Sequence, residues 1–184
     1  VQVEFNPAQV RAYRLIGYEN RVMAAQDFAD DRKDGGELGA GHSVTALYEV
    51  VPVGVATPVP ESDPLRYQEV RPRPGAAASS ELLTVKLRYK APDGDRSWLI
   101  EQPVRDRGTA LAATSVDFRF SAAVAQWGML LRDSRFKGSS TWAGAAELAR
   151  GALGHDENGY RAEFVRLLDE SRALAERERP ATER

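Results

Sequence analysis

The order of secondary-structure patterns along the chain constrains the fold more than any single motif does. Strand-like segments occupy the first 102 residues without helical patterns between them, and helical patterns follow. Antiparallel strands can be joined without helical crossovers, so this order favours an antiparallel arrangement. The sequence therefore predicts an α+β chain, with an antiparallel β-sheet or half-sandwich in the N-terminal part followed by about three packed α-helices.

Five segments have the alternation, or the β-branched and aromatic content, that is typical of strands. They are residues 1–5, 10–18, 44–53, 82–89 and 97–102. The turn-forming sequence Ala-Pro-Asp-Gly-Asp at 91–95 separates the last two segments. We therefore predict that these two strands form a hairpin.

The stretch 54–80 breaks the strand pattern. Proline cannot donate a ladder hydrogen bond and fixes φ, which excludes a central strand here. Six of the ten prolines lie in or beside the stretch: Pro52, Pro58, Pro60, Pro64, Pro72 and Pro74. We expect a long loop. A partner-binding proline segment is the alternative interpretation, and no PxxP arrangement supports it.

Three helical patterns follow the strands. Residues 115–132 are apolar almost all round, as in a helix buried between other elements. Ser140 is expected to cap a helix over 141–153, with Gly154 as its C′ glycine. Asp156 is expected to cap a third helix. The apolar stripe of that helix consists of Tyr160, Phe164, Leu167, Leu168, Ser171 and Leu174.

These patterns divide the chain into three parts. Residues 1–110 are expected to be mostly β and to contain the long loop 54–80. Residues 111–176 are expected to form a helical part that packs on the sheet, because the 115–132 helix is too apolar to bury one side alone. Residues 177–184 are expected to be a disordered tail.

Composition sets outer limits on function. The 184 residues carry a formal net charge of −2, which excludes a strongly basic nucleic-acid module of the usual kind. The chain has no cysteine and two histidines, so thiolate chemistry and a three-histidine metal site are excluded within one chain. No apolar run approaches the roughly 20 residues that span a bilayer. Tryptophans at 98, 127 and 142 lie in apolar patterns and are expected in the core.

The densest polar segment lies between residues 27 and 42. Ca²⁺ prefers several oxygen ligands from a short flexible loop, so a calcium- or small-ligand-binding module is one hypothesis for this segment. Its carboxylates are Asp27, Asp30, Asp31, Asp34 and Glu37. The EF-hand spacing is absent, and Arg32 and Lys33 neutralise part of the charge. A solvated acidic loop is the simpler interpretation.

A second polar group follows the second expected strand and is joined by a histidine further on. It consists of Arg14, Glu19, Asn20, Arg21 and His42. These residues are either a structural cluster, in which an Arg–Glu pair pins a strand end, or contacts for a ligand. An enzyme of unknown class that uses them in a cleft is a further alternative. No GxSxG or GxGxxG motif accompanies them.

Several long segments of the chain resemble one bacterial family. They are residues 1–7, 13–21, 39–49, 118–132 and 159–164. Together they are similar to the C-terminal domain that follows the von Willebrand factor type A domain in proteins of the YfbK type, an uncharacterised domain family. The resemblance covers essentially the whole chain. It implies no catalytic, cofactor or metal residues, because the metal-dependent adhesion site of such proteins belongs to the type A domain.

The resemblance also implies a setting for the chain. Its parents are similar to exported or lipid-anchored bacterial proteins, which points to the periplasm or cell envelope. We therefore expect a non-enzymatic accessory domain that supports or positions an upstream type A domain for protein–protein interaction. The expected partners are that type A domain and an unknown protein, with no nucleic acid, no cofactor and no membrane insertion by this segment.

Overall fold

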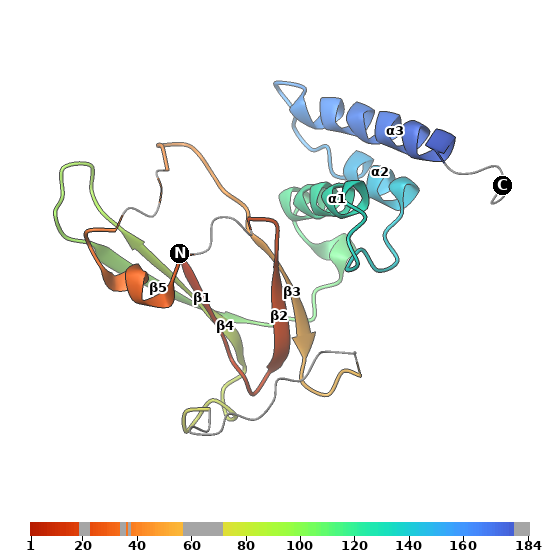
Figure 1. Ribbon diagram of the computed structural model, residues 1–184. Coiled ribbons are helices and arrows are strands. Elements are labelled where there is room, and N and C mark those ends of the chain that lie inside the picture. The colour runs from red at the N-terminus through yellow and green to blue at the C-terminus, as the bar shows by residue number, and fades with distance from the viewer. Residues whose placement is uncertain (19–22, 34–35, 37, 57–71, 179–184) are drawn as a thin grey trace. The chain divides into compact units, whose positions relative to one another are not determined.

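The chain consists of two compact units, Val1–Gly108 and Thr109–Arg184. Figure 1 shows the computed structural model, which describes residues 1–18, 23–33, 36, 38–56 and 72–178. The described strands all lie in the first unit and the α-helices in the second. The predicted α+β class, with antiparallel sheets before three helices, is confirmed.

The β unit contains two antiparallel sheets. Strands β1 (Gln2–Phe5), β4 (Glu81–Tyr89) and β5 (Trp98–Arg105) form a three-stranded sheet in the order β1-β4-β5. Strands β2 (Val10–Ile16) and β3 (Leu47–Pro52) form a two-stranded sheet. All five expected strands are present, with ends that differ by a few residues.

The predicted hairpin of β4 and β5 is confirmed, and its register pairs Leu87 with Ile100 and Tyr89 with Trp98. Strand β1 pairs with β4, far along the chain, with Val3 opposite Val85. Side chains alternate between the two faces of a sheet. The odd-numbered residues of β1 and β4 therefore share one apolar face with the even-numbered residues of β5.

An aromatic contact joins the two sheets. The ring of Phe5 stacks on Tyr13 with 4.0 Å between centroids and meets the edge of Tyr48 at 5.4 Å. Phe5 and Val10 are the apolar residues that are buried in the described part of this unit. Burial also raises the pKa of the Tyr48 hydroxyl. The β unit thus has a small centre where Phe5 lies between the sheets.

The helical unit has a core of small side chains. Its helices are α1 (Val116–Leu131), α2 (Trp142–Arg150) and α3 (Tyr160–Glu178). A 3₁₀ turn, η3 (Leu111–Ala113), precedes them, and another, η2 (Ala25–Ala29), lies in the β unit. The buried cluster consists of Ala123, Ala145, Ala146, Ala149 and Leu168, against which Phe120, Trp127, Leu130, Trp142, Leu148, Phe164 and Val165 pack.

The ends of α2 differ from the sequence-based expectation. Thr141, rather than Ser140, is the N-cap, because its Oγ1 accepts the Gly144 N–H at 3.0 Å. The helix ends at Arg150, so Gly154 is not its C′ residue. Gly154 instead has a φ of +56°, and a Cβ there would lie 2.9 Å from Val116 Cγ1. The glycine therefore permits a close approach to the start of α1.

Asp156 caps α3, as predicted. Its carboxylate accepts the backbone N–H groups of Arg161 at 3.2 Å and Ala162 at 2.9 Å. These hydrogen bonds lower the pKa of the Asp156 carboxyl. Arg161 in turn donates to the carbonyl oxygens of Ala152 and Leu153 after α2. It also pairs with Asp117 at the start of α1, so one guanidinium links α3 to α1 and to the segment after α2.

Two predicted apolar surfaces are only partly buried. Within the helical unit α1 is not buried all round, because α2 and α3 leave Phe118, Val124 and Leu131 exposed. In α3 Leu168 is buried and Phe164 packs on the core, whereas three other members of the stripe are exposed. These are Tyr160, Leu167 and Leu174. The alanine core explains the difference, since three helices that meet through methyl groups cover only a narrow strip of each helix.

Part of the expected loop and tail lies outside the described residues. This applies to 57–71 of the loop and to 179–184 of the tail, while α3 continues through residue 178. The expected packing of the helical part on the sheet stays a prediction. Among the described residues, none of the helices combines the length and apolar character needed to cross a membrane.

Candidate functional site

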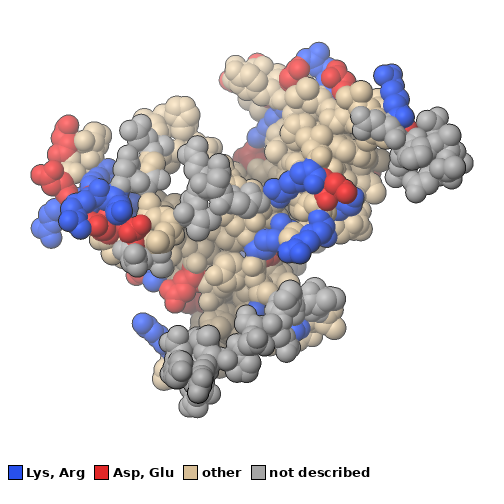
Figure 2. All heavy atoms as spheres, viewed as in Figure 1, with Lys and Arg blue, Asp and Glu red and all other residues tan. Residues whose placement is uncertain are grey.

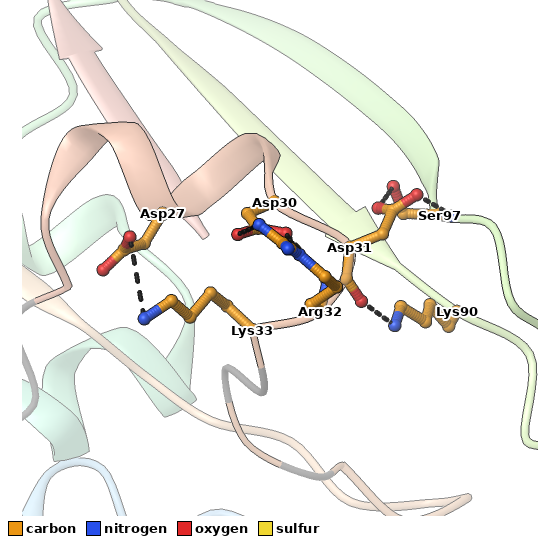
Figure 3. Close-up of polar contacts among 7 residues, drawn as sticks. All are labelled: Asp27, Asp30, Asp31, Arg32, Lys33, Lys90 and Ser97. Carbon is orange, nitrogen blue, oxygen red and sulfur yellow. Dashed lines mark hydrogen bonds and ion pairs between the residues drawn. The ribbon is translucent and has the colours of Figure 1, made fainter.

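The acidic segment that begins in η2 is held by local ion pairs (Figure 3). Asp30 accepts both the side-chain Nε and the backbone N–H of Arg32 at 3.0 Å. Lys33 Nζ lies 4.0 Å from Asp27. The contact with Arg32 lowers the pKa of the Asp30 carboxyl and raises that of the guanidinium. Two of the predicted carboxylates therefore have basic partners within the segment itself.

Asp31 connects this segment to the β4–β5 hairpin. Its carboxylate accepts the hydroxyl of Ser97 and, at 3.4 Å, the backbone N–H of the same residue. Lys90 donates to the backbone carbonyl of Asp31. Arg88 donates to Ser97 Oγ at 2.9 Å, and its guanidinium lies 5.6 Å from the ring centre of Phe28. The segment is thus attached to the turn end of the hairpin (Figure 3).

The hydrogen bond from Ser97 is also the main cause of the lowered pKa of the Asp31 carboxyl. Asp27, Asp30 and Asp31 therefore contact separate protein donors instead of converging on one point. In the described part of the chain, no group of three acidic or histidine side chains is placed to hold a metal ion. Asp34 and Glu37 lie outside the described residues, so the calcium hypothesis stays a prediction.

The second predicted polar group is only partly described. Arg14 donates through Nε to Glu49 at 3.1 Å, directly across the β2–β3 pair. Glu49 was not singled out from the sequence, because the two residues are 35 positions apart. His42 is exposed, with its ring against Gly39, where a Cβ would lie 2.8 Å from Nδ1. Residues 19–21 lie outside the described part, so the group stays a prediction.

An exposed group of apolar side chains lies on the β4–β5 hairpin. It consists of two cross-strand pairs, and we call it the hairpin patch: Leu87, Tyr89, Trp98 and Ile100, with 38%, 47%, 66% and 50% of their surface exposed. Trp98 was expected in the core, and that expectation is wrong. Trp127 and Trp142 do pack against the core of the helical unit.

The charged side chains of the described residues form no single-sign patch on the face shown in Figure 2. On the face shown in Figure 2, acidic and basic side chains lie interspersed. In the β unit, Lys86 contacts Glu4 at 2.9 Å and Glu101 at 3.8 Å. The contact with Lys86 lowers the pKa of the Glu4 carboxyl, and the carboxylate raises that of the ammonium. Such ion pairs near the surface contribute little to stability. The hairpin patch is therefore the more distinctive surface.

Together, these observations define an α+β chain of two units whose most distinctive surface is an apolar patch on an edge hairpin. Comparison with known proteins identifies its family. The chain belongs to the family described as "Uncharacterized protein YfbK, C-terminal", whose model matches residues 1–174. The resemblance seen in the sequence is thereby confirmed.

A curated relative from Escherichia coli (strain K12) is named "Uncharacterized protein YfbK". It is 40% identical over 168 residues, which is 91% of this chain. The chain spans 28% of the length of that relative. The matched region is thus a minor part of a longer protein. No solved structure matches the chain.

Proposed function

We propose that this chain is a non-enzymatic accessory domain that supports or positions an upstream von Willebrand factor type A domain for protein–protein interaction in the bacterial cell envelope. The observation that carries the proposal is the hairpin patch, because contiguous exposed apolar surface on a soluble domain is typical of a protein-binding site. The patch lies on a regular hairpin, so its four side chains are presented on a rigid element.

The length of the curated relative supports an accessory role. That relative is more than three times as long as the matched region, so a domain of this family occurs joined to other parts of a polypeptide. The type A domain and the envelope setting come from the family resemblance in the sequence.

The contacts of the polar residues support a non-enzymatic role. A serine nucleophile needs an adjacent general base, for which an imidazole is the usual group. Ser97 instead contacts Asp31 and Arg88. His155 contacts Glu157 at 2.9 Å, and the ring of His42 lies against the backbone at Gly39. Ser97 and His155 thus have polar partners other than a nucleophile–base pair, which supports the proposal.

Binding between separated domains tests the proposal. The type A domain of the longer protein would be titrated with this chain in a calorimeter. We expect saturable binding that Trp98→Ala weakens by about tenfold or more, as for a central aromatic contact. Leu174→Ala, which removes an exposed apolar side chain from the helical unit, is the matched control and should leave binding unchanged.

Two results would contradict the proposal. One is the absence of binding together with hydrolytic turnover that His42→Ala or Glu37→Ala abolishes, which would favour an enzyme. The other is a heat of Ca²⁺ binding that Asp31→Asn abolishes while the type A domain gives none. That result would favour the calcium-binding interpretation.

A further inference from the structure

Helices α1 and α3 contact each other through one row of side chains on each helix. The ring of Phe164 in α3 meets Phe120 at 5.3 Å and Trp127 at 5.4 Å between centroids. The indole N–H of Trp127 donates to Ser171 Oγ at 3.1 Å. Phe120 and Phe164 are 44 positions apart, and so are Trp127 and Ser171, so the two helices run parallel with this offset.

Helix α2 covers one side of this contact row. It packs against Ala123 of α1 and Leu168 of α3, which are both fully buried. Its Arg150 also pairs with Asp169 of α3 at 2.6 Å. The side of α1 at Ala123 and the side of α3 at Leu168 therefore both face α2.

The opposite side of the contact row is open within the described residues of the helical unit. Successive residues of an α-helix point about 100° apart. The position after Ala123 therefore lies beyond the contact row in α1, and the position before Leu168 lies beyond it in α3. These two positions are Val124 and Leu167, and both are exposed.

Apolar side chains continue along this open side in steps of seven residues. We call this surface the two-helix face, and all of its members are exposed: Val124, Leu131, Tyr160, Leu167 and Leu174. Val124 and Leu167 are 43 positions apart, as are Leu131 and Leu174, which is one fewer than the pairs of the contact row. The members of each pair therefore lie at the same level along the two parallel helices.

A glycine lies within the two-helix face. Gly128 is in the interior of α1, between Val124 and Leu131. Glycine destabilises a helix interior relative to alanine. A Cβ at Gly128 would have no described atom within 4 Å, so no contact inside the described chain explains the glycine. The missing side chain allows the backbone of another helix to approach α1 closely at this point.

The two-helix face has an acidic margin on the α3 side. Glu163 and Glu170 are exposed next to the apolar row of α3, on the side away from α1. Glu163 pairs with Arg166, whereas Glu170 has no ion pair among the described residues. On the α1 side, uncharged residues border the face between Asp117 and Arg132 at its two ends. A partner that covers the face must therefore place positive charge along α3.

We propose that the two-helix face binds one amphipathic helix of a partner protein, which is apolar on the bound side and carries Lys or Arg beside Glu163 and Glu170. The bound helix lies opposite α2 and completes a four-helix bundle. Apolar rows with seven-residue spacing on two parallel helices match a helix with apolar residues at heptad positions a and d. The inference does not depend on the proposed function, because all of its residues lie in the helical unit.

A second copy of this chain fits the face less well. A two-fold axis across the helices lays α3 on α3 and brings Glu163 near Glu170 of the second copy, which repeats a like-charge contact. An axis along the helices lays α3 of one copy on α1 of the other. Both glutamates then lie beside uncharged residues of α1. A basic helix is the occupant that complements the acidic margin.

A synthetic helical peptide tests this site in the 184-residue chain. The probe has three heptads with Leu at positions a and d and Lys at the flanking positions e and g, and its twin has Glu in place of Lys. Fluorescence anisotropy of the labelled peptide at nanomolar concentration measures binding. We expect saturable binding of the Lys peptide and about tenfold weaker binding of the Glu peptide. Glu170→Lys should reduce that difference, because it removes one of the two acidic contacts.

Substitutions that keep the net charge separate the face from the rest of the helical unit. Leu131→Gln and Leu167→Gln should each weaken binding of the Lys peptide by about tenfold, since each removes a central apolar contact. Phe118→Gln, at an exposed apolar position on another side of α1, is the matched control. Gly128→Leu should weaken binding and yet raise the thermal midpoint of the free chain, because leucine favours a helix and the position has room for it.

Three results would overturn the proposal. The first is the absence of saturable binding of the Lys peptide at hundreds of micromolar of the chain. The second is binding that Phe118→Gln weakens as much as Leu167→Gln does. The third is a dimer in analytical ultracentrifugation that Leu167→Gln dissociates without any peptide, which would make a second copy the occupant of the face.

Discussion

The two units of the chain bury their apolar side chains to very different extents. In the helical unit, Ala123, Ala145, Ala149 and Leu168 have no exposed surface. In the described part of the β unit, Phe5 and Val10 are the buried apolar residues, and both keep some surface exposed. The comparison teaches that a regular sheet register does not by itself supply a core.

The difference in burial follows from the shapes of helices and sheets. Helices that meet through alanine methyl groups approach closely, so a few small residues exclude water completely. A sheet presents a broad flat face that only another layer can cover. In the β unit the aromatic contact at Phe5 provides such cover locally, while the hairpin patch stays exposed.

The largest expected change in stability comes from removing the aromatic contact at the centre of the β unit. Phe5→Ala removes the ring that contacts both Tyr13 and Tyr48. We expect the free energy of unfolding of the β unit to fall by about 4 kcal/mol. The measurement is hydrogen exchange of the β1 and β4 amides, with the α1 amides as internal reference. Equal loss of protection in both units would show that they unfold together.

Leu168→Ala should destabilise the helical unit. The side chain is fully buried among alanines, so its removal leaves a cavity that small neighbours cannot fill. We expect a loss of about 3 kcal/mol in denaturant unfolding followed by far-ultraviolet circular dichroism. Leu174→Ala, on an exposed position of the same helix, should cost far less. Similar losses for both variants would contradict the described core.

Loss of the N-cap of α2 should destabilise the helical unit by a smaller amount. Thr141→Ala removes the hydroxyl that accepts the Gly144 N–H, so we expect a loss of about 1 kcal/mol. Ser140→Ala, one residue earlier, should be close to neutral. Thermal unfolding of the two variants side by side measures the difference. The reverse ranking would restore Ser140 as the cap.

The smallest expected effect concerns the attachment of the acidic segment to the hairpin. Because the pKa of Asp31 is lowered in the folded chain, this attachment contributes stability above the ordinary value of 3.8. The contribution is lost as the pH falls through the lowered pKa.

Ser97→Ala removes the main cause of that shift, so the pKa of Asp31 should rise toward 3.8. Carboxyl chemical shifts in an NMR titration measure it, and Ser43→Ala serves as the control. A pKa that does not move in Ser97→Ala would mean that the hydroxyl is not the donor that matters.

Much of the fold could be predicted from the sequence, because alternation and turn chemistry are local. The turn at 91–95 places β4 and β5 side by side, and Asp156 precedes a clear helical stripe. The pairing of β1 with β4 carries no local signal, since the partners are about 80 residues apart. The exposure of apolar residues on α1 was also missed, because a hydrophobic pattern does not identify the elements that pack against a helix.

The candidate site was less predictable for the same reason. The acidic segment stands out in the sequence, but its partners Ser97, Arg88 and Lys90 follow some 60 residues later, in a stretch without unusual composition. Trp98 was assigned to the core because it lies in an apolar sequence pattern. Only the register shows that it pairs with Tyr89 at the turn end of the hairpin.

The pairing of β1 with β4 has a consequence for the order in which the chain folds. Gln2 lies opposite Lys86, so the first strand must await residues that are synthesised much later. Closing such a long loop is slow, whereas helices that contact their neighbours in sequence form quickly. During synthesis, the N-terminal strand therefore stays unpaired until β4 has left the ribosome. The helical unit is made last but meets no comparable delay.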